Sequence, residues 1–465
     1  MRLCFSIAKS WLARASILAI HSSVRRRLPW FELNPNLRIR RRTAVWVLSI
    51  ALAGSAAVFL RSRSLVPRSA GTLRQEVYVW QRDWGAAVTE SISRHASNFA
   101  MVVPLAAEAV WEGGAFKTAR IPIDFELLKS AGPEVGLALR IGPYPGPYRS
   151  EGEPIDGFVR LATSLIAEAE FQGLTLAELH IDFDCPDSQL AGYRKWIEAL
   201  KKQTQIPVFV TALPSWLNEA AFVGLAKAAD GYILQVHSLS HPKSQSGAFQ
   251  ICDPEQALRW VERAARLRIP FRVALPTYGF QAAFAADGKF LSAVAEGPEP
   301  VWPEGTVLRS IQSEPTAMAE LSRKWTADRP SVLTGLIWYR LPIQGDTLNW
   351  SWPTLAAVLR RRTPLPHWAF GTRRREPGLI EVTLDNDGEL DLDLLPAVRV
   401  RWSEGRLIAG DGLGGYELME SASGTAQFVP RKEAGRRRVR AGESRVVGWL
   451  RLELKEQSTI NVETL

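Results

Sequence analysis

The chain has few of the residues that hold metals and disulfides. Its 465 residues include three cysteines and six histidines. Cys185 and Cys252 have no second cysteine or histidine at the short spacing of a zinc site, so we expect no metal. No glycine-rich phosphate loop follows the first apolar run of the main part of the chain, which counts against a nucleotide-binding fold. We therefore expect no cofactor.

Acidic residues are almost absent from the first 75 positions. This segment holds 14 of the 57 Lys and Arg residues but only one of the 48 acids, Glu32. The formal net charge of +9 therefore comes from this segment, and the rest of the chain is slightly acidic. A main domain without excess positive charge is not expected to bind nucleic acid.

One long uncharged run lies inside the basic segment. Residues 44–60, AVWVLSIALAGSAAVFL, are flanked by arginines, with more of them before the run than after it. Seventeen residues is the short end of a membrane-spanning helix, and the charge bias places the N-terminus in the cytoplasm. We predict a basic cytoplasmic segment (1–43), a transmembrane anchor (44–60) and a linker (61–75), with the remainder in the periplasm. A cleaved signal peptide and a buried soluble helix are the alternatives.

From residue 76 onward, short apolar runs alternate with amphipathic helical stretches, and most runs stop at a proline. Eight strands alternating with helices predict a (β/α)8 barrel over residues 76–370, with a doubly wound open sheet as the alternative. Residues 284–306 are expected to form a long loop after the seventh strand. The apolar runs are residues 77–80, 99–104, 135–143, 177–186, 206–214, 231–237, 269–276 and 335–342.

The last hundred residues have a different pattern. Residues 371–465 contain alternating β segments such as AVRVRW and RVVGWLRLEL, and Asp385-Asn-Asp-Gly388 is a hairpin turn signal. We predict a small all-β, sandwich-like domain after the barrel.

The fourth apolar run carries an unusual set of polar residues. In HIDFD, His180, Asp182 and Asp184 occupy every second position and so share one face of a strand. Barrel enzymes build their sites at the C-terminal strand ends. Two carboxylates this close raise the pKa of one of them, which a general acid needs. We predict Asp184 and Asp182 as catalytic; the alternative is that Asp182 is a structural partner of Arg140.

The other strand ends carry aromatic, arginine and amide side chains. Such a set suits a polyhydroxylated ligand, because aromatic faces pack on sugar C–H surfaces and polar groups bind hydroxyls. The predicted substrate-binding residues are Trp80, Arg82, Arg140, Tyr144, His180, Gln235, His237, Tyr278, Trp338 and Arg340. The alternative is a hydrogen-bonded interior position for His180 and a place in the core for the tryptophans.

Two family resemblances follow from these motifs. HIDFD resembles the D-x-D-x-E motif on strand four of the family 18 chitinases, which implies Asp184 as the acid, Asp182 as the orienting group and Trp338 as the floor of the sugar site. This chain has His180 at the first motif position and the shorter Asp184 at the last. YVWQRDW, DFDCP, LQVHSL and FRVALPTYGF together resemble the bacterial domain of unknown function 3142 over residues 76–365, which implies a glycosidase-like TIM barrel.

Two functions are consistent with the sequence. The first is an envelope-anchored glycoside hydrolase-like protein, and the second is a non-catalytic barrel that binds carbohydrate or scaffolds an envelope complex. We expect a carbohydrate ligand and a membrane contact through the N-terminal helix, while the sequence leaves the oligomeric state open. In an oxidising compartment, Cys185 and Cys252 are also predicted to form a disulfide, with two ordinary buried thiols as the alternative.

Overall fold

The computed structural model describes residues 66–465, except residues 150, 238–241, 243, 297–299, 423, 432–437 and 454–457. The predicted cytoplasmic segment, membrane anchor and most of the linker therefore lie outside the described residues. Among the residues that are described, no helix is long and apolar enough to span a membrane.

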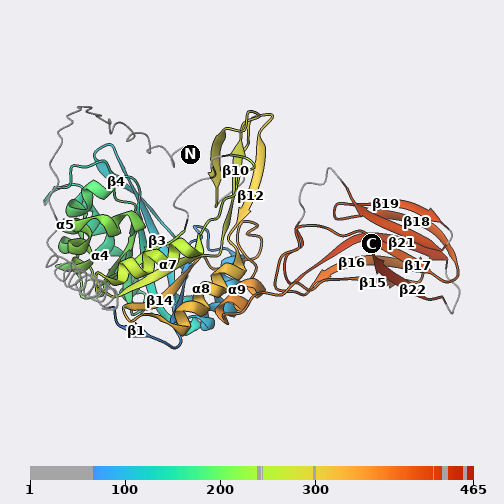
Figure 1. Ribbon diagram of the computed structural model, residues 1–465, viewed down its shortest axis with the longest axis horizontal. Coiled ribbons are helices and arrows are strands. Elements are labelled where there is room, and N and C mark those ends of the chain that lie inside the picture. The colour runs from blue at the N-terminus through green and yellow to red at the C-terminus, as the bar shows by residue number, and fades with distance from the viewer. Residues whose placement is uncertain are drawn as a thin grey trace, which may run out of the picture. The chain divides into compact units, whose positions relative to one another are not determined.

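Eight parallel strands form a closed barrel, as the alternating pattern predicted (Figure 1). Each strand pairs with the next, and β14 closes the barrel against β2. A further strand, β4 (Ala115–Arg120), pairs antiparallel with the long end of β3. The barrel strands are β2 (Arg74–Val79), β3 (Met101–Glu112), β5 (Glu134–Ile141), β6 (Glu178–Phe183), β7 (Val208–Ala212), β8 (Gly231–Gln235), β9 (Phe271–Pro276) and β14 (Leu333–Tyr339).

Helices cover the outside of the barrel. Their apolar faces pack against the outward side chains of the strands, and Trp196 of α5 is completely buried in this layer. Helix α7 begins where the sequence indicates, because Asp253 caps its free amides and Pro254 occupies the first turn. The helices are α2 (Ala86–His95), α3 (Phe125–Ala131), α4 (Ile155–Phe171), α5 (Leu190–Lys201), α6 (Ala220–Ala228), α7 (Pro254–Ala265), α8 (Pro315–Ala327) and α9 (Trp352–Leu359). The two-residue strands β1 (Arg68–Ser69) and β13 (Arg329–Pro330) pair beside them.

Strand β6 shows how alternation divides the two faces of the barrel wall. Leu179, Ile181 and Phe183 belong to the outer core beneath the helices. Glu178, His180 and Asp182 occupy the intervening positions and so face the barrel interior. The polar residues of this strand therefore lie along the inside of the barrel, in order from its base to its mouth.

The base of the barrel contains a buried charge network. Arg272 of β9 contacts Glu76 of β2 at 2.5 Å and Glu178 of β6 at 2.6 Å. The ring of His180 bridges Glu178, at 2.5 Å, and the hydroxyl of Tyr78, at 2.9 Å. All five residues are buried. Charges withdrawn from water are tolerated only when they are paired in this way.

The segment after β9 differs from the loop that the sequence predicted. Much of it folds as a three-stranded antiparallel sheet of β10 (Gly279–Phe284), β11 (Phe290–Val294) and β12 (Val307–Gln312), which projects from the barrel (Figure 1). Its side chains form a small apolar cluster of their own, including Phe280 and Phe284. The short strands and frequent glycines hid this sheet in the sequence.

The C-terminal region consists of two four-stranded antiparallel sheets, in agreement with the predicted all-β domain. Val382 and Leu450 from one sheet and Val400 and Phe428 from the other join a single core. The sheets pack closely, because a side chain at Gly448 would collide with the ring of Phe428. One sheet contains β15 (Ala369–Glu376), β16 (Leu379–Asn386), β21 (Glu443–Glu453) and β18 (Arg406–Gly412); the other contains β19 (Tyr416–Ala422), β20 (Thr425–Pro430), β17 (Val398–Trp402) and β22 (Ile460–Thr464).

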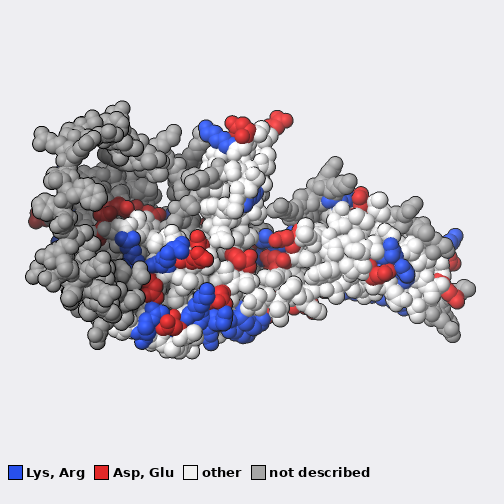
Figure 2. Space-filling model, viewed as in Figure 1, with Lys and Arg blue, Asp and Glu red and all other residues white. Residues whose placement is uncertain are grey.

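Charged side chains are mixed over the visible face of the molecule. Figure 2 shows basic and acidic groups interspersed, with no broad surface of one sign. On this face, the residues that the structure describes form no continuous positive stripe.

Candidate functional site

The two predicted catalytic carboxylates stand at the C-terminal end of β6. Asp182 is the last inward-facing residue of the strand, and its Oδ1 accepts a hydrogen bond of 2.8 Å from the Thr211 hydroxyl of β7. Asp184 follows the strand and is exposed to solvent. It has no hydrogen bond or ion pair to any residue that the structure describes. One carboxylate is thus held by a neighbour, and the other is free to meet a ligand.

The surroundings of Asp184 favour its protonated form. Protein atoms close to the carboxyl displace part of its water, and the negative charge of Asp182 repels a second one. Together they raise the pKa of Asp184 to about 6, although the positive charge of Arg140 acts in the opposite direction. A carboxyl group with this pKa is still partly protonated near neutral pH and can donate a proton.

Arg140 does not form the close pair with Asp182 that a purely structural aspartate would need. Its ion pair is with Glu108 on β3, at 3.9 Å. Its positive charge nevertheless reaches both Asp182 and Asp184, which are among the groups that raise its pKa. Asp184 is therefore not sealed against an arginine.

A chain of ion pairs extends from Glu108 along the rim of the barrel. The guanidinium of Arg82 binds both carboxylate oxygens of Glu108, at 2.7 and 2.8 Å, and reaches Glu296 at 2.6 Å. Glu296 also accepts a 2.6 Å hydrogen bond from the Tyr339 hydroxyl. Burial opposes its ionisation, but Arg340, Arg82 and Tyr339 outweigh that effect and hold the pKa of Glu296 below its ordinary value.

Sequence reasoning missed Glu296 as a member of this site, and it placed Tyr339 at the end of the eighth strand without including it among the predicted binding residues. Glu296 follows β11, in a stretch predicted as a loop, and no pattern ties it to a barrel strand. Tyr339 lies one residue after the tryptophan that was predicted to face the mouth. Its ring lies among inward-facing residues of the barrel, beside Trp80 at 5.2 Å between ring centres. The unbroken apolar and aromatic run at the end of β14 does not mark which of its residues face inward.

The end of β8 contributes a buried histidine. The Nδ1 atom of His237 lies 3.3 Å from the Tyr278 hydroxyl, and its ring stacks on Tyr339. Complete burial lowers the pKa of His237 to about 3, so the ring is neutral. Gln235, two residues earlier, donates to the backbone carbonyl of His237 at 3.3 Å. These predicted binding residues do lie together at the mouth.

Three predicted binding residues lie elsewhere. Trp338 is completely buried on the outer face of β14, where its indole nitrogen donates to Gln75 at 2.7 Å. Tyr144 packs in the same outer layer, and its hydroxyl donates to the Pro147 carbonyl at 2.7 Å. His180 sits deeper in the barrel, between Tyr78 and Glu178. None of these three side chains reaches the mouth.

The predicted disulfide is not formed. Cys185 and Cys252 are both buried free thiols. The sulfur of Cys185 lies 3.5 Å from the Tyr148 hydroxyl, and burial raises the pKa of the Cys185 thiol to about 12. Cys252 lies just before α7, and its pKa is raised to about 12 by burial as well. Each thiol is thus an inert packing residue in this structure.

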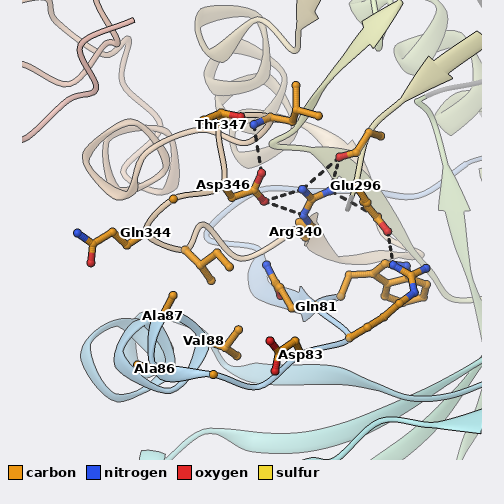
Figure 3. A pocket seen from close by; sticks show the side chains of 17 residues that line it. Gln81, Asp83, Ala86, Ala87, Val88, Glu296, Arg340, Gln344, Asp346 and Thr347 are labelled. Atoms are coloured by element: carbon orange, nitrogen blue, oxygen red, sulfur yellow. Dashed lines mark hydrogen bonds and ion pairs between the residues drawn. The ribbon is translucent and has the colours of Figure 1, made fainter. Parts of the chain in front are cut away.

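A separate pocket opens beside the ion-pair chain (Figure 3). It has a volume of about 690 Å³ and lies between the start of α2, the segment after β14 and the end of β11. Trp80, Arg82, Glu296 and Arg340 belong to its wall, whereas Asp182 and Asp184 do not. Within the described part of the chain, no cluster of three or more potential metal-binding side chains occurs.

The solved structures that this chain resembles are barrels of low sequence identity. The spore cortex-lytic enzyme SleL of Bacillus cereus is 12% identical and has a TM-score of 0.44, over 63% of this chain and 75% of that one. A chitinase from Chromobacterium violaceum is 14% identical with a TM-score of 0.41, over 62% and 98%. Chitinase ChiA74 of Bacillus thuringiensis is 8% identical with a TM-score of 0.42, over 84% and 100%. No curated protein matches the chain.

Family comparison covers the barrel and the β domain separately. Residues 370–453 match a domain of unknown function, DUF8456. Residues 158–344 match another, DUF3142, and include β6 with both carboxylates, β8, β9 and β14. The match includes the DFDCP, LQVHSL and FRVALPTYGF motifs, whereas YVWQRDW at the first strand lies before it.

Proposed function

We propose that this protein is a glycoside hydrolase-like enzyme of the cell envelope, with Asp184 as its general acid. The observation that carries the proposal is an exposed carboxyl at the mouth of the barrel, with a pKa raised to about 6 beside a second carboxylate. This is the combination that glycosidic bond cleavage needs.

The reaction would proceed as follows. Asp184 gives its proton to the glycosidic oxygen as the bond to the anomeric carbon breaks, and the departing sugar leaves as an alcohol. Asp182, held by Thr211, faces the positive charge that develops on the anomeric carbon. Water then adds to that carbon and gives a proton to the Asp184 carboxylate, which returns Asp184 to its protonated form. Residues two apart on a strand are about 6.5 Å apart at the backbone, close enough for both carboxylates to act on one sugar.

Side chains around the carboxylates would hold the glycan. Arg140 and Gln235 offer hydrogen-bond donors at the mouth, and the rings of Trp80 and Tyr339 line the adjoining interior. His237 is neutral, and its buried Nε2 atom has no hydrogen-bond partner among the described residues, so a small shift of the ring would let it bind a sugar hydroxyl. Tyr278, which contacts His237, would orient that ring.

The envelope location rests on the N-terminal sequence. We propose that the uncharged run at residues 44–60 anchors the chain in the cytoplasmic membrane and that the barrel acts outside it. A barrel held at a membrane surface would act on glycans of the cell envelope.

A second candidate function is favoured by the rim of the barrel. Arg82 is bound by Glu108 and Glu296, and Arg340 by the same Glu296 and by Asp346, so most charges around the mouth already neutralise one another. A barrel with such a rigid rim could bind a glycan or hold an envelope complex without cleaving anything.

A cleavage screen separates the two functions. The full-length protein and Asp184→Asn are incubated with polysaccharides and peptidoglycan fragments, and new reducing ends are counted. We expect cleavage by the wild type and a loss of about 10²-fold or more in the variant. The matched control is Asp156→Asn, which changes an exposed carboxylate at the start of α4. Equal product from wild type and Asp184→Asn would remove Asp184 from the chemistry.

A further inference from the structure

The pocket beside the mouth has features of a ligand site that the catalytic proposal does not use. It is concave and of ligand size, and its wall combines apolar groups, such as Ala86, Ala87 and Val88 from α2, with charged groups. In Figure 3, Asp83 and Gln81 stand on one side, and Arg340 with its partners Asp346 and Glu296 stands across from them.

Polar atoms of the pocket wall lack partners. Trp80 is only 3% exposed, yet its indole nitrogen has no acceptor among the described residues. The Oε1 atom of Gln81 is equally without a donor there, while its Nε2 binds the Leu341 carbonyl at 3.1 Å. Buried polar groups normally have partners, so these two closed-off atoms carry an energetic cost that a small rotation of either side chain toward a ligand in the pocket would relieve.

The charges of the pocket select the kind of ligand. Both arginines are already engaged: Arg82 binds Glu296, and Arg340 binds Asp346 at 2.5 Å and Glu296 at 3.4 Å. The carboxylate of Asp83 is exposed and has no hydrogen bond or ion pair to any described residue. The pocket therefore offers an uncompensated negative charge and no free positive one, which disfavours an anionic ligand.

We propose that this pocket is a second glycan subsite, which binds a sugar unit bearing a free amine. The amine would contact Asp83, the sugar hydroxyls would meet Gln81 and Trp80, and the apolar face of the ring would pack against Ala87 and Val88. The ligand class rests on the proposed function. Trp80 belongs both to the pocket wall and to the aromatic interior of the barrel, so one glycan chain could occupy this subsite and the mouth together.

Direct binding tests the subsite separately from catalysis. Calorimetric titrations of the full-length Asp184→Asn protein use three oligosaccharides of four units: a glucosamine oligomer, its N-acetylated form and an oligouronate. We expect the glucosamine oligomer to bind tightest and the oligouronate weakest. Oligouronate binding as tight as that of the glucosamine oligomer would overturn the proposal, whether or not the wild type cleaves any glycan.

Two substitutions in the same background locate the site. Ala87→Trp fills the pocket and should weaken the binding of all three ligands by at least about tenfold; Ala167→Trp, at an exposed position of α4, is its control.

Asp83→Asn removes only the charge. It should lower the affinity for the glucosamine oligomer about tenfold and leave that for the N-acetylated form unchanged. Asp156→Asn is the matched control. Since Asp83 has no partner to lose, this variant should fold normally; unchanged glucosamine affinity in it would refute the role of the carboxylate.

Discussion

The base and the mouth of the barrel both carry ionisable side chains, but these side chains differ in burial and in ion pairing. At the base, Arg272, Glu76 and Glu178 are buried and pair with one another at 2.5–2.6 Å. At the mouth, Asp184 is exposed and unpaired among the described residues, next to a carboxylate of the same sign. The same strand, β6, supplies a member of each group.

The two environments shift the carboxyl pKa values in opposite directions. Burial alone would raise the pKa of Glu178, but His180 and Arg272 outweigh it and lower the pKa to about 2. Loss of water and the repulsion of Asp182 raise that of Asp184 to about 6. Charges at the base therefore stabilise the fold. At the mouth, the ionised form of Asp184 is disfavoured, and this is what allows the side chain to donate a proton.

The largest effect is expected at the base. Arg272→Ala leaves Glu76 and Glu178 buried without their shared partner, and the free energy of unfolding should fall by about 3–5 kcal/mol. Denaturant unfolding at pH 7 measures it, with Arg323→Ala on the surface of α8 as a control that should change stability by less than about 1 kcal/mol. A loss of less than about 1 kcal/mol in Arg272→Ala would contradict the stabilising role of the base.

Acid should weaken the base network next. Because the folded pKa of Glu178 is about 2 and lies below its ordinary value, the network stabilises the protein above about pH 4.5. That contribution, about 3 kcal/mol, is lost as the pH falls from there toward 2. Unfolding curves at several pH values should show a shallower acid dependence in Glu178→Gln than in the wild type. Identical dependences would place the acid sensitivity elsewhere in the molecule.

At the mouth, the Asp182 contact is expected to matter for rate rather than for stability. Thr211→Val removes the hydroxyl that donates to Asp182 and keeps the shape of the side chain. We expect kcat/KM for glycan cleavage to fall by about tenfold, with a stability loss of about 1 kcal/mol. The ratio of the two effects is informative: a large stability loss with unchanged kcat/KM would make Asp182 a structural residue.

The sequence predicted the barrel well because apolar runs ending at proline mark strands directly. It also placed Asp182 on the inner face, since β6 alternates cleanly between apolar and polar residues. Strand β14 gave no such signal, because Leu336, Ile337, Trp338 and Tyr339 are all apolar or aromatic. The face that each one occupies is set by neighbouring strands, so the sequence pattern could not tell that Tyr339, and not Trp338, faces the interior of the barrel.

Contacts between residues far apart in the chain could not be predicted either, because they too depend on how the strands are arranged in space. Arg272 and Glu76 are separated by 196 positions, and only the closed barrel brings them together. Glu296 reaches the mouth from the three-stranded sheet, whose path no periodicity predicts. Local alternation thus identifies which side chains face inward, whereas the contacts that decide their charge depend on the complete fold.

The smallest predicted effect is the pH dependence of stability that Asp184 causes, and its sign is opposite to that of Glu178 at the base. Because the pKa of Asp184 rises on folding, to about 6, the protein binds that proton more tightly when folded, and stability should fall as the pH rises from about 4 to 6. Asp184→Asn removes this dependence and should be more stable than the wild type above pH 6, by at most about 1 kcal/mol, since solvent screens an exposed charge. Thermal and denaturant unfolding between pH 4 and pH 8 measure the difference, with Asp156→Asn as the control. A variant less stable than the wild type at pH 7 would show that the mouth carboxylate contributes to the fold as the base carboxylates do.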